Sequence, residues 1–296
     1  MRRTGRRLKY LLMAVLLIIA LVVIIRLVLP EKEDPQSNQV YIDTGTGMAW
    51  MTPYDNVPAS DLTADDFILV NDQPVYQGSA YRTEIGIDVS EHQYEVDWEK
   101  VAQSVDFAYI RLGYRGNTEG GLFLDPWYER NIAGSNAAGL DTGVYFYSQA
   151  INVGEAIEEA EFVIEHLRGR RVNLPVIFDW ETEKGSGTRT DTWDKQTLTD
   201  CAVAFCQTLK NAGYDSGLYF NRRIGYYGHD LGELSDYGYD LSRLTDYCFW
   251  VAVPGAWPDY YYACEFWQYS YIASVPGVEG DVDMNMRFIP VSTGSQ

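Results

Sequence analysis

The sequence is short of basic residues. It has 23 Lys and Arg against 42 Asp and Glu, a net charge of −19, and six of the bases fall within residues 1–30, where there is no acid. The other 266 residues therefore carry 42 acids and 17 bases, a net charge of −25. Because so acidic a surface repels phosphate backbones, we predict no nucleic-acid partner.

Motifs for several common chemistries are also missing. The chain has only three His and four Cys, no C-x-x-C pair, and no G-x-S-x-G, P-loop or H-E-x-x-H motif. A zinc cage is therefore disfavoured, and we predict neither a metal nor a cofactor. Cys248 and Cys264 fall in neighbouring predicted strands, and the sequence leaves open whether they pair or stay as buried free thiols.

The first thirty residues have the pattern of a membrane anchor. Residues 1–9 are basic, and residues 11–25 are fifteen uninterrupted apolar residues. Because Arg26 can snorkel to the interface, we predict a transmembrane helix over 10–29, roughly 30 Å long. The positive-inside rule puts residues 1–9 in the cytoplasm and the rest outside. The alternative is a cleaved signal peptide, but no A-x-A-like site follows the apolar run.

Beyond the anchor we predict an extracytoplasmic stalk, a folded domain and a short tail. Residues 30–84 have mixed polarity and several turn formers, with one hairpin-like segment at 67–76. We therefore assign 30–84 to the stalk, 85–290 to the folded domain and 291–296 to a C-terminal tail.

Strand and helix patterns alternate from residue 85 onward. Alternation of this kind predicts a parallel sheet, and eight strands suggest a closed barrel. The last three strands are too close in sequence for full crossover helices. We therefore predict an α/β fold, an irregular TIM-like barrel of five β/α units and three nearly bare strands. The predicted strands are 85–89, 107–114, 143–148, 175–181, 216–221, 247–253, 264–270 and 280–285, and the helices 96–104, 126–139, 153–169 and 194–213.

Four acids stand where predicted strands end. Asp88 ends the first strand, Asp179 and Glu181 the fourth, and Asp283 the eighth. Active sites of such barrels lie at the carboxyl ends of the strands, and residues two apart on a strand share a side. If the four acids converge on one cleft, their mutual repulsion and desolvation raise the pKa of at least one of them. A carboxyl with a raised pKa can act as the general acid that glycosidic bond cleavage requires. The alternatives are a solvated surface pair or a metal site.

Nine segments follow one another along the chain: GIDVSEHQ (86–93), VDW (96–98), FAYIRLGYRG (107–116), GVYFYS (143–148), PVIFDWE (175–181), GLYFN (217–221), FWVAV (249–253), EFWQYS (265–270) and VDMN (282–285). In this order they resemble glycoside hydrolase family 25, the Chalaropsis-type lysozymes that cleave peptidoglycan. The likeness covers about 86–288 and implies a (β/α)5β3 barrel. It also implies hydrolysis of the β-1,4 bond between N-acetylmuramic acid and N-acetylglucosamine in glycan strands.

The resemblance also implies catalytic roles. Glu181 matches the general acid that protonates the leaving oxygen, and Asp179 matches the partner of the substrate's N-acetyl group. Because that group can itself attack the anomeric carbon, no protein nucleophile is needed. Asp88 and Asp283 would hold the acid's protonation state and contact sugar. Inversion and substrate-assisted retention both stay open.

Aromatic and polar residues near strand ends are candidates for sugar contacts. Core packing is the alternative for each aromatic ring, a solvated or ion-paired guanidinium for the arginine, and loop capping for the glutamines. At residues 145–148 alternation allows only one of each neighbouring pair to face the cleft. The family often has Gly where this chain has Tyr94. The candidates are Tyr145, Tyr147, Trp250, Trp267, Tyr269, Arg111, Gln93 and Gln268.

Two other functions compete with a muramidase. A catalytically silent peptidoglycan-binding or scaffold module could lose its acids freely, yet all four are present. A family 18 chitinase would carry acids where this chain has Leu174 and Ile177. We therefore expect a single-pass protein of a bacterial cell membrane that remodels nearby wall. Its protein partners are not predictable.

Overall fold

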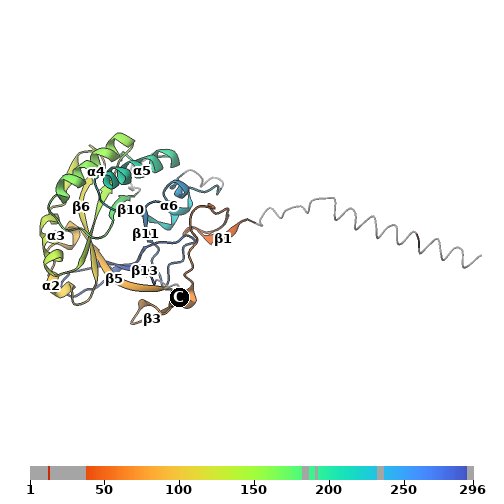
Figure 1. Cartoon of the computed structure of the whole chain (residues 1–296), viewed down its shortest axis with the longest axis horizontal. Coiled ribbons are helices and arrows are strands. Elements are labelled where there is room, and N and C mark those ends of the chain that lie inside the picture. The colour runs from red at the N-terminus through yellow and green to blue at the C-terminus, as the bar shows by residue number, and fades with distance from the viewer. Residues whose placement is uncertain (1–12, 14–37, 182–186, 191–192, 232–236, 292–296) are drawn as a thin grey trace, which may run out of the picture. The chain divides into compact units, whose positions relative to one another are not determined.

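The computed structural model describes residues 13, 38–181, 187–190, 193–231 and 237–291 (Figure 1). The predicted anchor at 10–29 lies, except for Met13, outside these residues, as do the predicted tail 1–9 and all but the first residue of 291–296. Within the described ranges, no helix combines the length and hydropathy that crossing a bilayer needs.

Eight strands close into a barrel, as predicted. β5 pairs with both β6 and β13, so the sheet closes on itself, and β7 (Leu122–Leu124) is an extra strand on the edge of β6. All neighbours from β5 round to β12 run parallel. The barrel strands are β5 (Tyr81–Val89), β6 (Phe107–Arg115), β8 (Asp141–Ser148), β9 (Val176–Trp180), β10 (Ser216–Asn221), β11 (Cys248–Ala252), β12 (Phe266–Ala273) and β13 (Val282–Pro290).

The last strand differs from the prediction. β13 is antiparallel to both of its neighbours and begins at Val282, so Asp283 starts this strand rather than ending it. Because β13 runs the opposite way, its first residues lie at the rim where the parallel strands end. Asp283 is in register with Asp88 of β5. The wrong strand direction therefore still put Asp283 at the correct rim.

Helices follow the first five barrel strands and cover the outside of the barrel (Figure 1). All four predicted helices are present with shorter bounds, and no helix lies between β11 and β13, where every residue is described. The helices are α2 (Trp98–Val101), α3 (Tyr128–Ala137), α4 (Val153–Leu167), α5 (Lys195–Asn211) and α6 (Arg222–Tyr226), with 3-10 turns η1 (Ala64–Asp66), η2 (Glu91–Gln93) and η4 (Leu241–Arg243).

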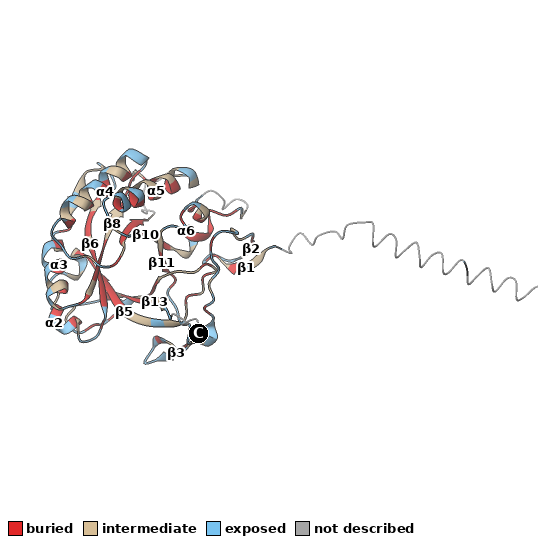
Figure 2. Ribbon diagram, viewed as in Figure 1, coloured by how far each residue is buried: buried red, intermediate tan, exposed pale blue. Residues whose placement is uncertain are grey.

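Local sequence explains where the long helices start and which face they bury. The side chains of Asn152 and Asp194 cap α4 and α5 by accepting hydrogen bonds from backbone amides three residues on. Helix α4 buries Ala156, Ala160 and Val163, which recur at helical spacing on one face. This face packs toward the strands, which Figure 2 shows as mostly buried.

The barrel interior is filled by large apolar side chains. Phe107, Tyr109, Ile177, Trp250 and Phe266 form one buried cluster. The rings of Tyr109 and Trp250 stack with centroids 4.5 Å apart. This packing closes the barrel below the rim and confines open space to its mouth.

Most of the segment predicted as a stalk packs against the barrel. The described residues from Tyr41 onward form one compact unit. This segment contains β1 (Val40–Asp43), β2 (Met48–Met51), β3 (Phe67–Val70) and β4 (Gln73–Tyr76). The β3–β4 pair is the predicted hairpin, with positive φ at both turn residues, 71 and 72, as a type I′ turn requires. The Phe67 ring meets Trp267 edge-on at 5.6 Å.

Candidate active site

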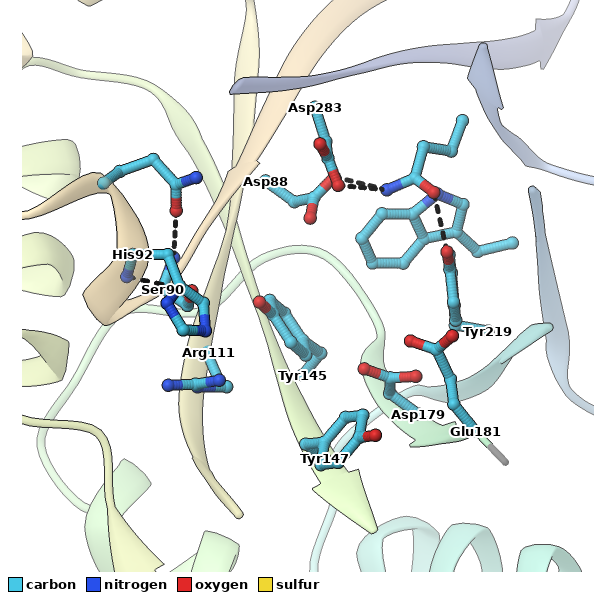
Figure 3. Close-up of a pocket in the computed structure, with 13 residues that line it drawn as sticks. Asp88, Ser90, His92, Arg111, Tyr145, Tyr147, Asp179, Glu181, Tyr219 and Asp283 are labelled. Carbon is cyan, nitrogen blue, oxygen red and sulfur yellow. Dashed lines mark hydrogen bonds between the residues drawn. The ribbon is translucent and has the colours of Figure 1, made fainter. Parts of the chain in front are cut away.

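One cleft of about 450 Å³ lies at the barrel mouth and brings together all four predicted acids (Figure 3). The side chains come from all eight barrel strands and from the segments that follow β5 and β9. They are Asp88, Ser90, His92, Gln93, Arg111, Tyr145, Tyr147, Asp179, Glu181, Tyr219, Trp250, Gln268 and Asp283. Six of the eight predicted contact residues line the cleft, and at 145–148 the two tyrosines face it, as alternation allows.

Trp267 and Tyr269 do not line the cleft, contrary to expectation. Side chains alternate along β12, and Gln268 occupies the face that points into the barrel mouth. Trp267 is fully buried on the other face, where its Nε1 donates to the Val253 carbonyl at 2.8 Å. Tyr269 lines a separate apolar hollow with Met284. Both rings therefore serve packing.

Amide side chains hold the first pair of acids. Gln268 Nε2 donates to Asp88 Oδ2 at 2.9 Å and to Asp283 Oδ2 at 3.1 Å, and Asn285 Nδ2 donates to Asp88 Oδ2 at 2.8 Å. Tyr219 donates its hydroxyl proton to Gln268 Oε1 at 2.6 Å, so the amide must turn its NH2 toward the acids. Asp88 and Asp283 are thus fixed as a coupled pair.

Burial raises the pKa of both carboxyls toward the neutral range. Desolvation raises the pKa of Asp88 to about 6, although the hydrogen bonds from Asn285 and Gln268 oppose the rise. Desolvation, with the charges of Asp88 and Glu181, raises the pKa of Asp283 to about 8. The pair can therefore share a proton at the cleft wall.

The second pair of acids stands at the end of β9. Figure 3 shows Asp179 and Glu181 side by side, as their spacing of two requires. Asp179 is 6% exposed, and its Oδ1 finds no hydrogen-bond partner among the described residues. Burial raises its pKa well above the usual range, reinforced by the charges of Glu181 and Asp88 and opposed by Arg111. Glu181 is half-buried.

A buried clamp fixes the backbone at Glu181. Gln149 Nε2 donates to the Glu181 carbonyl at 3.2 Å, and its Oε1 accepts from the Thr190 hydroxyl at 2.8 Å. Gln149 is fully buried and Thr190 is 2% exposed. The clamp therefore ties together both ends of the segment between β9 and α5.

Arg111 lines the cleft but pairs with other acids. Its Nε donates to Asp125 and its Nη2 to Glu91, both at 2.8 Å. The Asp125 side chain is fully buried, so this ion pair is held inside the protein. The charge of Arg111 therefore acts on the cleft carboxyl Asp179, where it counteracts the rise in pKa.

Sequence reasoning did not assign Tyr219, Ser90, His92 or the supporting Asn285 to the site. Tyr219 is in register with Asp179 on one side and Trp250 on the other. Strand alternation would have found it only once the register was known. Of the described residues, no three His, Cys, Asp or Glu side chains are arranged to hold a metal ion. All four cysteines are free thiols.

The sequence model of glycosyl hydrolases family 25 matches residues 87–278. The chain belongs to this family. It is a glycoside hydrolase of the lysozyme type. It is 29% identical over 220 residues to protein YegX of Escherichia coli K12, covering 68% of each chain. It is 27% identical over 221 residues to lysozyme M1 of Streptomyces globisporus, covering 68% of this chain and 66% of that one.

Solved structures of family 25 hydrolases and autolysins have the same fold. The autolysin LytC of Streptococcus pneumoniae matches with a TM-score of 0.57 and 25% identity, over 84% of this chain and 56% of LytC. A family 25 glycosyl hydrolase of Bacillus anthracis matches with a TM-score of 0.54 and 20% identity, over 71% of this chain and 94% of that one.

Proposed function

We propose that this family 25 enzyme hydrolyses the β-1,4 bond between N-acetylmuramic acid and N-acetylglucosamine in peptidoglycan. Glu181 is the general acid that protonates the leaving oxygen. The observation that carries this assignment is its position at the cleft mouth beside the buried Asp179. A carboxyl among other carboxylates in a desolvated cleft can hold its proton until the glycosidic oxygen takes it.

Asp179 assists by positioning the substrate's N-acetyl group. Its Oδ1 is buried and has no partner among the described residues, so it is ready to accept a hydrogen bond from the acetamido N–H. That bond would aim the acetamido oxygen at the anomeric carbon and stabilise the charge that develops there. No nucleophile from the protein is required.

The remaining residues of the cleft hold the sugars. Tyr145, Tyr147 and Trp250 offer ring faces, and Gln93 offers an amide, all lining the same hollow. Asp88 and Asp283 maintain the protonation state of the general acid Glu181, and they contact sugar hydroxyls. Support for this substrate comes from relatives, since LytC has also been solved with a synthetic peptidoglycan ligand. The element order supports the (β/α)5β3 description of the barrel.

We also propose that residues 10–29 anchor the enzyme in a bacterial cell membrane, with residues 1–9 in the cytoplasm and the barrel outside. The apolar run and the basic residues before it support this topology. A tethered hydrolase reaches only nearby wall, which suits local remodelling. Active barrel released freely into the culture medium would contradict it.

The experiment incubates the full-length chain with purified peptidoglycan and identifies the new reducing ends. Reducing muramic acid is expected. Reducing glucosamine would contradict the bond assignment, and binding without any new ends would indicate a silent wall-binding module.

A further inference from the structure

A second hollow is lined by the segment that follows the cleft residues Ser90, His92 and Gln93 in the chain. It has a volume of about 360 Å³, and its walls come from helices α2 and α3 and the segments that lead into them. One stretch of chain serves both hollows, because Ser90, His92 and Gln93 line the cleft whereas Glu95 and the residues up to Glu99 line the second hollow. We call this second hollow the α2–α3 groove.

The α2–α3 groove carries side chains that suit a sugar. Arg130 lies 4.8 Å from the ring centroid of Trp127 and pairs with Glu95 at 2.5 Å. Asn131 is 1% exposed; its Oδ1 accepts from Trp98 Nε1 at 3.4 Å, while its Nδ2 has no partner among the described residues. The groove thus combines indole rings, carboxylate acceptors and one amide donor, Asn131 Nδ2, that has no hydrogen-bond acceptor among the described residues.

The charge of the groove narrows the ligand class. Glu95, Asp97 and Glu99 line the groove. Arg130 pairs with Glu95 and Lys100 pairs with Asp97 at 2.7 Å, so the three acids outnumber the two bases and an anionic ligand is disfavoured. A neutral N-acetylated sugar fits better, because its hydroxyls can donate to carboxylates. Its acetamido oxygen can accept from Asn131 Nδ2, and its apolar face can pack on an indole ring.

Tyr94 lies in sequence between the residues that line the cleft and those that line the groove, and its backbone conformation favours glycine. Its φ is 50° and its ψ −128°, and its side chain is 68% exposed. In the chain it separates Gln93 of the cleft from Glu95 of the groove. A bulky residue at positive φ strains the backbone and destabilises the folded state. Because the ring of Tyr94 is exposed, it buries too little apolar surface to offset this strain. Such a residue points to binding.

We propose that Tyr94 and the α2–α3 groove extend the cleft and bind a further N-acetylated sugar of the same glycan strand. The proposal rests on the proposed function of the cleft, because the strand must enter there. Tyr94 supplies an exposed ring on the segment of chain that connects the residues of the two hollows, and Trp127 and Asn131 hold the sugar beyond it.

The test compares long glycan strands, freed of stem peptides, with a tetrasaccharide of the same repeat, using the full-length chain. Tyr94→Gly and Trp127→Ala should each raise KM for long strands about fivefold, equivalent to roughly 1 kcal/mol. They should leave tetrasaccharide cleavage unchanged. Tyr94→Phe keeps the ring and should behave like wild type. Tyr41→Ala is the matched control, since Tyr41 is 56% exposed but lines neither hollow.

The readouts separate this proposal from the function proposed for the cleft. If wild type cleaves both substrates and neither Tyr94→Gly nor Trp127→Ala changes the long-to-short ratio of KM, the extension is overturned. If wild type cleaves neither, the cleft proposal fails, and affinity for the N-acetylglucosamine tetramer becomes the test. Weaker tetramer binding by Trp127→Ala supports the groove. Tetramer binding by Trp127→Ala that equals wild-type binding overturns it.

Discussion

Two buried carboxyls, Glu159 of α4 and Asp179 of β9, have different surroundings. Glu159 is fully buried, and burial raises its pKa to about 7. Its Oε1 accepts from Arg115 Nε at 2.7 Å and its Oε2 from the Ser148 hydroxyl at 2.6 Å. Asp179 is almost as buried, yet its Oδ1 has no partner among the described residues and its cleft is open to a ligand.

The difference separates a carboxyl that supports the fold from one prepared for chemistry. Buried polar groups are normally hydrogen-bonded, so each exception needs a reason. For Glu159 the protein supplies all the partners, and the pair with Arg115 ties α4 to β6. For Asp179 we infer that the substrate supplies the missing partner. Substitutions should therefore change stability at one site and activity at the other.

The largest stability effect should come from Glu159→Ala. Removing the buried partner of this ion pair leaves Arg115 with only the exposed Glu158 carboxylate as a counter-charge and should cost about 3–5 kcal/mol of unfolding free energy. The matched control is Glu158→Ala. Glu158 contacts the same guanidinium at 3.2 Å but its side chain is 62% exposed, so the loss should stay below about 1 kcal/mol. Chemical denaturation measures both, and equal losses would refute the distinction.

Asp179→Asn should show the opposite pattern. Turnover should fall about 10²-fold, because a neutral amide cannot become the carboxylate that would stabilise the acetamido group as charge develops on it. Stability at pH 7 should hold or rise, since ionising a carboxyl whose pKa is raised by burial opposes folding. Activity assays and thermal unfolding of the same preparation test this. A variant that unfolds as readily as Glu159→Ala would place Asp179 among the structural carboxyls.

The free energy of unfolding should fall as the pH rises through the pKa values of Asp88 and Asp283. Unfolded Asp has a pKa of about 3.9, whereas Asp88 and Asp283 have raised values of about 6 and about 8. The native state therefore holds more protons between roughly pH 4 and 8, and each such carboxyl contributes at most about 1.4 kcal/mol per pH unit, less where solvent screens it. Asp283→Asn should flatten the upper part of this slope. Unfolding free energy that increases over this window would contradict the raised values.

The smallest effect should be a gain in stability from Tyr94→Gly. Relief of the positive-φ strain, less the greater chain entropy of glycine, should leave a gain of up to about 1 kcal/mol. Thermal unfolding against Tyr94→Ala checks this, because alanine removes the ring without relieving the backbone. A destabilised glycine variant would show that the ring supports the fold.

The sequence predicted the acids because their signal is local. Asp88, Asp179 and Glu181 follow runs of buried apolar residues, and parallel strands end at one rim. The direction of β13 could not be read, because side-chain alternation is the same in both directions. Asp283 was placed at the correct rim because the start of an antiparallel strand coincides with the ends of the parallel ones.

Other features of the site depended on which side chains of a strand face the cleft and on which strands are neighbours. Trp267 and Tyr269 were assigned to the cleft although Gln268 between them was assigned there too, and alternation forbids all three. Tyr219 required knowledge of which strands flank β10. The buried Glu159 had a usable signal, because it shares a helical face with Ala156 and Val163.

The most direct test compares Glu181→Gln with Glu159→Gln in the release of reducing muramic acid from peptidoglycan, per folded molecule. Loss of the proton donor should reduce the rate for Glu181→Gln by at least about 10²-fold, while Glu159→Gln should turn over normally once folded. Near-normal release by Glu181→Gln would contradict the assignment of the general acid.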